Sequence, residues 1–131
     1  MRYTAPMESI PFSLDLGLST IQGVLRLERT DLAIEWRRYD LFDSPQGELE
    51  SLRVPYTRLQ RVDFRHRAIG GTVLIQADGA SAFSTLPLPS GEITTLRATI
   101  KRRHRSDAQG WAAEAGLRIA EAEDPGMIAD S

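Results

Sequence analysis

The sequence of 131 residues contains no cysteine, which excludes disulfide bonds and metal sites built on thiolates. No apolar run approaches the length of a bilayer span, and the acidic Glu8 and Asp15 stand where a signal peptide would be apolar. The formal net charge is only -2, so no overall field attracts nucleic acid or an anionic membrane. These absences predict a soluble cytoplasmic protein without stable membrane insertion.

Groups that carry catalysis are also scarce. His66 and His104 are the only histidines, and each stands in a run of cations. Neither therefore resembles a general base or a member of a metal site. Gly70 and Gly71 lack the downstream residues of a phosphate-binding loop, and no serine has the context of a nucleophile elbow. We expect no enzymatic activity, no metal and no cofactor.

The sequence does contain short runs in which apolar and polar residues alternate, from residue 12 to residue 100. Successive side chains of a strand point to opposite faces, so a period of two predicts half-buried strands. The clearest pair is a hairpin of residues 21–27 and 32–36 around a tight turn at Thr30 and Asp31. Further strands are predicted within residues 10–18, 52–56, 62–64, 72–76, 83–86 and 96–100.

A helix is predicted after the last strand. Ser106 and Gln109 have the spacing of a capping box, and Trp111 lies on an apolar stripe that would anchor the helix on the sheet. A helix continued to residue 121 would place Leu117 and Ile119 on opposite sides, whereas a left-handed cap at Gly116 would keep them together on an extended tail. We favour the short helix, residues 106–115. The domain then spans residues 10–122, between a flexible lead (1–9) and a disordered tail (123–131).

Seven or eight antiparallel strands followed by one C-terminal helix resemble the pleckstrin-homology-like (PH-like) fold, specifically the bacterial PH-like domains. The matching segments are the hairpin of residues 23–36, the apolar-Pro-x-x-x-apolar corner of residues 54–59, and residues 62–64 and 72–79. The resemblance implies a mainly β PH-like barrel or sandwich that acts as a non-catalytic binding or self-assembly module. A lipocalin-type barrel carrying a small apolar ligand is the alternative.

Two segments are candidate sites. The first is the basic run of residues 101–105: on a strand, Arg97, Lys101 and Arg103 would share the outward face and could bind phosphate or an anionic lipid. The same charges would equally suit a solvated strand end that discourages edge-to-edge pairing. No aromatic residues stand between these cations, so nucleic acid is not an expected partner.

The second candidate is Leu41 and Phe42, a bulky apolar pair within residues 39–48, the longest stretch predicted to be irregular. The pair either folds back over one end of the core or stands exposed. An exposed pair would contact a protein partner or a second copy of the chain, because exposed aromatic residues tend to anchor interfaces.

Overall fold

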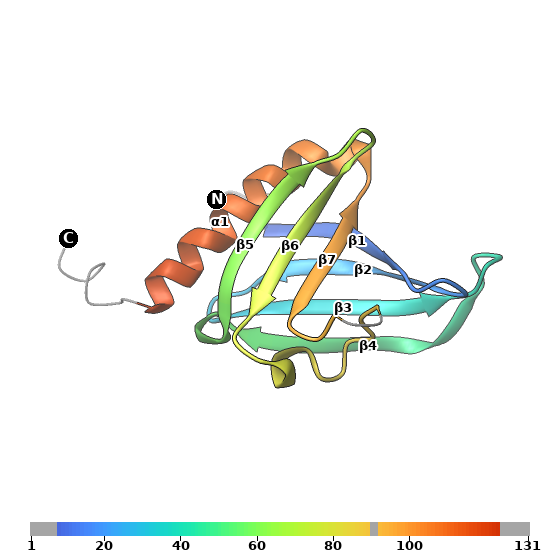
Figure 1. The fold of residues 1–131 in the computed structure, drawn as a ribbon, viewed down its shortest axis with the longest axis horizontal. Helices are drawn as coiled ribbons and strands as arrows, with labels where there is room; N and C mark the ends of the chain where they lie inside the picture. The colour runs from blue at the N-terminus through green and yellow to red at the C-terminus, as the bar shows by residue number, and fades with distance from the viewer. Residues whose placement is uncertain (1–7, 90–91, 124–131) are drawn as a thin grey trace, which may run out of the picture.

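The computed structural model describes residues 8–89 and 92–123. In these residues seven strands form one antiparallel sheet in the order β4-β3-β2-β1-β7-β6-β5, followed by one long helix (Figure 1). The strands are β1 (Ser9–Asp15), β2 (Thr20–Leu27), β3 (Asp31–Tyr39), β4 (Pro45–Pro55), β5 (Leu59–His66), β6 (Gly71–Ala77) and β7 (Thr95–Ile100), and the helix is α1 (Arg105–Glu123). The fold is therefore mainly β with a C-terminal helix, as predicted.

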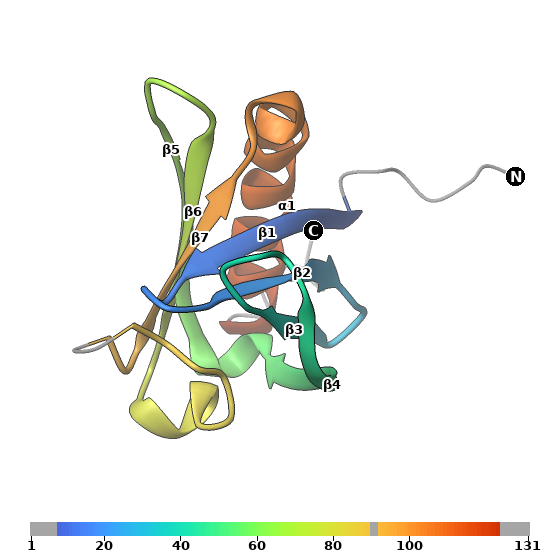
Figure 2. The same ribbon diagram turned by 90° about the vertical axis from the view of Figure 1, so that its right-hand side faces the viewer.

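The sheet is folded over at the contact between β1 and β7. β1 pairs with β2 along its whole length, but with β7 only where Ser13 lies opposite Thr99. Strands β1–β4 form one half and β5–β7 the other, and the strands of the two halves run in different directions. The halves meet where β1 lies beside β7 (Figures 1 and 2). The helix α1 packs mainly against β5 and also touches β1, so it contacts both halves of the sheet.

The inward faces of both halves build one hydrophobic core. In the predicted hairpin the alternating residues are buried as expected, including Leu25, Ile34 and Trp36. Trp111 of α1 is fully buried, and its Nε1 donates a hydrogen bond to the carbonyl oxygen of Glu8 at 3.3 Å. The predicted role of Trp111 as the anchor of the helix is confirmed.

The prediction of a short helix over residues 106–115 is wrong, because α1 continues through Gly116 to Glu123. Ile119 is buried while Leu117 is 61% exposed, so the long helix separates the two apolar side chains and buries only one. Arg118 holds the last turns in place: its Nη1 donates to the carbonyl oxygen of Glu28 at 2.9 Å and its Nε donates to Glu114 at 3.0 Å. The bond to Glu28 joins residues 90 apart in the chain, which no local pattern reveals.

The predicted domain limits change at both ends. Ser9 opens β1 and Glu8 contacts α1, so both belong to the folded domain rather than to a lead of residues 1–9. Glu123 closes α1 and does not belong to a tail. The rest of the predicted lead, residues 1–7, and of the predicted tail, residues 124–131, lies outside the described residues.

Two further predictions are corrected. Residues 39–48 are not one irregular stretch, since β3 extends to Tyr39, β4 begins at Pro45 and only residues 40–44 form the turn. Phe83 and Leu86 do not form a strand: both are buried in the long connection from β6 to β7, where residues Ala80–Phe83 form a 3-10 helix. No described helix is long and apolar enough to cross a membrane.

Candidate functional site

The turn between β3 and β4 is held by the side chain of Asp40. Its Oδ1 accepts hydrogen bonds from the backbone N–H groups of Phe42, at 2.8 Å, and Ser44, at 2.9 Å. Its carbonyl oxygen accepts another from the N–H of Asp43 at 3.1 Å. Asp43 has a φ of 63°, a left-handed conformation that aspartate tolerates better than most residues. The acidic residues that make this loop look polar in the sequence thus fix its conformation.

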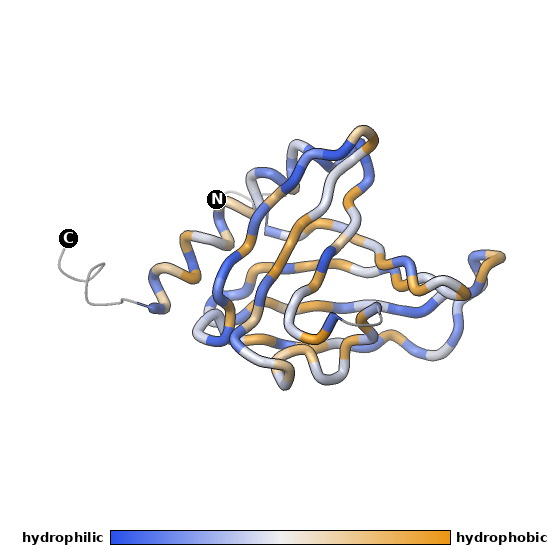
Figure 3. Tube along the Cα trace, in the orientation of Figure 1, coloured by the Kyte–Doolittle hydropathy of each residue, from blue (hydrophilic) through white to orange (hydrophobic). Residues whose placement is uncertain are grey.

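This fixed turn presents Leu41 and Phe42 to solvent, with exposed fractions of 64% and 87%. The pair does not fold back over the core. The turn between β1 and β2 lies at the same end of the sheet, away from α1, and exposes Leu18 at 83% (Figure 1). Figure 3 shows hydrophobic segments at both turns. Leu18, Leu41 and Phe42 together are called the hairpin-tip surface below.

The two turns are connected to each other. Thr20 of β2 pairs with Tyr39 of β3, which places the two turns next to each other. Nη1 of Arg38 donates a hydrogen bond to Oγ of Ser19 at 2.9 Å, from β3 to the turn between β1 and β2. The hairpin-tip surface is therefore formed by two neighbouring turns that are held by hydrogen bonds.

The strand β4 continues from this surface along one edge of the sheet. Its residues 45–51 are exposed, and they include Leu49 at 62%. The other edge strand, β5, packs against α1, whereas β4 has β3 as its only strand partner in the described part of the chain. An uncovered edge strand offers backbone hydrogen-bonding groups to another strand.

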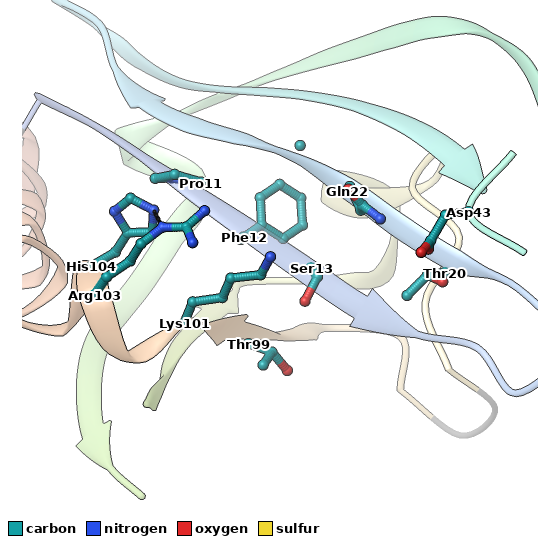
Figure 4. A pocket seen from close by; sticks show the side chains of 11 residues that line it. Pro11, Phe12, Ser13, Thr20, Gln22, Asp43, Thr99, Lys101, Arg103 and His104 are labelled. Carbon is teal, nitrogen blue, oxygen red and sulfur yellow. Dashed lines mark hydrogen bonds between the residues drawn. The ribbon is translucent and has the colours of Figure 1, made fainter. Parts of the chain in front are cut away.

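A cavity of about 330 Å³ opens on the outer side of the sheet, where β1 and β7 separate (Figure 4). Pro11, two residues before the Ser13–Thr99 pair, has no N–H with which to continue a ladder. The lining is mixed: Pro11, Phe12 and Gly23 contribute apolar surface, and cationic or basic side chains stand at one end. The polar lining residues are Ser13, Thr20, Gln22, Asp43, Thr99, Lys101, Arg103 and His104.

The three residues predicted to share an anion-binding strand face are not all brought together. β7 ends at Ile100 and residues Arg102–His104 form a 3-10 helix, so Arg103 does not continue the alternation of the strand. Lys101 and Arg103 nevertheless both line the cavity. Arg97 does not line it, and its Nε pairs with Glu92 at 2.9 Å. The predicted anion-binding set is thus reduced to two of its members.

The pairing of charges differs across the molecule. Arg26 donates hydrogen bonds to Glu28 at 2.6 Å and to Glu35 at 2.9 Å, and these bonds hold the pKa of both carboxyls below the ordinary value of 4.5. In contrast, no described carboxylate lies within 4.0 Å of Lys101 or Arg103. The cations at the cavity are therefore available to an anionic ligand.

A second, shallower hollow of about 580 Å³ lies between the turn from β2 to β3 and the end of α1. Tyr56 lines it, and its hydroxyl donates to the carbonyl oxygen of Glu28 at 2.6 Å, next to the bond from Arg118 to the same oxygen. Burial raises the pKa of the Tyr56 hydroxyl above its ordinary value of 10.0. These groups bond to one another and hold α1 against the sheet, which is a structural role.

The described residues contain no group of three metal-binding side chains. His66 packs edge-on against Phe64 with ring centroids 5.0 Å apart, and Nε2 of His104 accepts a hydrogen bond from Nε of Arg103 at 3.2 Å. No family model matches the chain, and neither the curated proteins nor the solved structures include a match. Function must therefore be argued from the geometry of the hairpin-tip surface and the cavity.

Sequence reasoning identified Leu41, Phe42, Lys101 and Arg103 but missed Leu18, which was included in the strand predicted within residues 10–18. The available signal in the sequence was Gly17. Its φ is 93°, and its N–H donates a hydrogen bond to Oδ1 of Asp15 at 2.9 Å, so the chain turns and β1 ends before Leu18. The polar lining of the cavity had no local signal, because its residues come together only when β1 meets β7.

Proposed function

We propose that this chain is a PH-like, non-catalytic binding module, which contacts a second copy of itself or another protein through the hairpin-tip surface and the adjacent edge of β4. One observation carries the proposal: Phe42 is 87% exposed on a turn whose conformation is fixed by hydrogen bonds to Asp40. The cytoplasm is the proposed location, since a chain without cysteine suits a reducing compartment.

Apolar side chains at the hairpin-tip surface can supply the free energy of association. Burying a Leu or Phe side chain contributes roughly 1.5–3 kcal/mol, and the hairpin-tip surface offers three such side chains from two neighbouring turns. A turn that is already ordered loses little conformational entropy when it binds. The exposed edge of β4 could add backbone hydrogen bonds by strand addition.

The architecture supports the PH-like part of the proposal. A four-stranded and a three-stranded half joined through β1 and β7, with one C-terminal helix, agree with the arrangement that the sequence resemblance implies. The alternative of an apolar-ligand carrier needs a cavity lined by the large aromatic residues. Trp36, Phe83 and Trp111 instead pack in one continuous core cluster, which favours the binding module.

The test is the solution mass from light scattering over a range of protein concentrations, repeated in high salt. We expect the mass to rise above the 14.6 kDa of one chain, and to do so in high salt as well, because apolar contacts are not screened. Phe42→Asp should restore the monomer. The matched control is Ile69→Asp, which introduces the same charge at an 80%-exposed apolar residue in the turn between β5 and β6.

Equal loss of assembly in both variants would contradict a contact at the hairpin-tip surface. A wild-type protein that is monomeric throughout would overturn self-assembly and leave a separate partner. That partner would then have to be retained by immobilised wild type and by Ile69→Asp, but not by Phe42→Asp. If immobilised Phe42→Asp retained the partner as well as the wild type does, the proposal would be overturned.

A further inference from the structure

The cavity between β1 and β7 has the charge distribution of a binding site. Figure 4 shows Lys101, Arg103 and His104 at one end, Thr20 and Asp43 at the other, and Ser13 between them. The amino group of Lys101 points into the cavity toward Ser13 (Figure 4). The hydrogen bond to Nε2 of His104 orients the guanidinium of Arg103. Two cations without a described carboxylate partner and several neutral hydrogen-bonding groups therefore face one open hollow.

The position of these cations in the chain is unfavourable without an anion. Lys101 and Arg103 directly precede α1, which begins at Arg105, and the positive end of the helix dipole repels cations. Arg97 and Arg58 have carboxylate partners at 2.9 Å, whereas Lys101 and Arg103 have none within 4.0 Å among the described residues. A bound anion at the cavity would relieve the repulsion among the cations and interact favourably with the helix dipole.

We propose that this cavity binds a phosphate monoester, with the phosphate group held by Lys101 and Arg103. The inference concerns the hollow between β1 and β7 and does not depend on the proposed assembly. A phosphate monoester carries roughly -1.5 to -2 charges at neutral pH, which the two cations balance, and its three terminal oxygens accept hydrogen bonds from several directions. The hydroxyls of Ser13 and Thr99 are the neighbouring neutral donors.

The size and the far end of the cavity indicate the rest of the ligand. At about 330 Å³ the cavity lies within the range of small-molecule sites, roughly 300–1,000 Å³, and exceeds what a free phosphate ion fills. The remaining space is bounded by Gln22, Thr20 and the carboxylate of Asp43. These groups suit a body with hydroxyl groups, as in a sugar phosphate, since a carboxylate accepts hydrogen bonds from hydroxyls.

The experiment is isothermal titration calorimetry of the whole chain with glucose 6-phosphate, inorganic phosphate and glucose. A parallel arm measures cosedimentation with phosphatidylcholine vesicles with and without phosphatidic acid, whose head group is also a phosphate monoester. We expect glucose 6-phosphate to bind more tightly than inorganic phosphate, and glucose not to bind. Binding to vesicles alone would assign the phosphate monoester to a lipid rather than to a soluble molecule.

Variants locate the site. Lys101→Ala and Arg103→Ala should each weaken binding about tenfold or more, because each removes a charge-assisted hydrogen bond. The matched control is Arg102→Ala: Arg102 is exposed and lies between the other two in the sequence, but it does not line the cavity. Circular dichroism should be unchanged in all three variants.

The proposal is overturned if neither soluble phosphates nor phosphatidic acid vesicles bind. It is also overturned if Arg102→Ala weakens binding as much as Lys101→Ala, since attraction to diffuse positive charge would then explain the result. If Lys101→Ala and Arg103→Ala lose binding of the phosphate monoester and Arg102→Ala keeps it, the proposal is supported, whatever the outcome of the assembly experiment.

Discussion

Gly23 lies at the closest approach of two strands, β2 and β3. A Cβ atom at this position would overlap the backbone carbonyl oxygen of Glu35 and lie 2.9 Å from Cα of Trp36. Because both contacts are to backbone, no side-chain rotation relieves them. Gly23→Ala should therefore lower the free energy of unfolding by about 2 kcal/mol or more, measured by urea denaturation. An unchanged stability would contradict the close approach.

Arg26 and its two carboxylates predict a dependence of stability on pH. Hydrogen bonds from Arg26 lower the pKa of Glu28 and Glu35 in the folded state, so the unfolded state binds more protons as the solution is acidified. Their contribution to stability is therefore full above the ordinary pKa of 4.5 and is lost as the pH falls through the folded pKa values. Arg26→Met should destabilise the protein at neutral pH, and the difference from wild type should shrink in acid.

Urea denaturation at a series of pH values measures this difference. The control is Arg102→Met, which removes the same charge where no described carboxylate lies within 4.0 Å. Its difference from wild type should be nearly independent of pH in the same range. A constant difference for Arg26→Met would show that the ion pairs do not contribute.

At the scale of elements, the length of α1 gives a direct test at Gly116. The residue lies inside the helix and a Cβ there would meet nothing within 4 Å. Alanine is favoured over glycine in a helix interior, so Gly116→Ala should raise the free energy of unfolding by roughly 0.5–1 kcal/mol. If Gly116 were a left-handed cap, the same substitution would destabilise the protein. Urea denaturation distinguishes the helical residue from the left-handed cap by the sign of the change in the free energy of unfolding.

The elements that the sequence predicted well are those with one buried face. The hairpin of β2 and β3 alternates clearly because Leu25, Ile34 and Trp36 face the core. The first half of β4 is exposed on both faces. Neither face has to be apolar there, so the sequence does not alternate, and residues 45–48 were predicted to be part of an irregular stretch. The end of α1 depends on Arg118 reaching Glu28, a contact between residues 90 apart in the chain.

The same reasoning explains which parts of the candidate sites were predictable. Leu41 and Phe42 are adjacent and stand out against a polar loop, so composition alone revealed them. Lys101 and Arg103 were visible as part of a basic run. Their meeting with Ser13 was not, because only the pairing of β1 with β7 brings these segments together.

At the scale of the whole molecule, both halves of the sheet and the helix share one core cluster. Trp36 belongs to one half and Trp111 to the helix, and both are buried. Single-tryptophan variants, Trp36→Phe and Trp111→Phe, should each give a fluorescence transition in urea that coincides with the transition by circular dichroism. A separate early transition reported by Trp111 would show that α1 unfolds independently of the sheet.

The hydrogen bond from Trp111 to the carbonyl oxygen of Glu8 joins residues 103 apart in the sequence. On the ribosome the N-terminal segment emerges first, so β1 leaves the tunnel long before the helix that covers it has been synthesised. The part of the core that α1 covers, including the contact of Trp111 with Glu8, stays incomplete until α1 arrives. The domain thus completes its fold only after α1 has been synthesised, and we expect a nascent chain stalled before residue 105 to aggregate more readily than the complete domain.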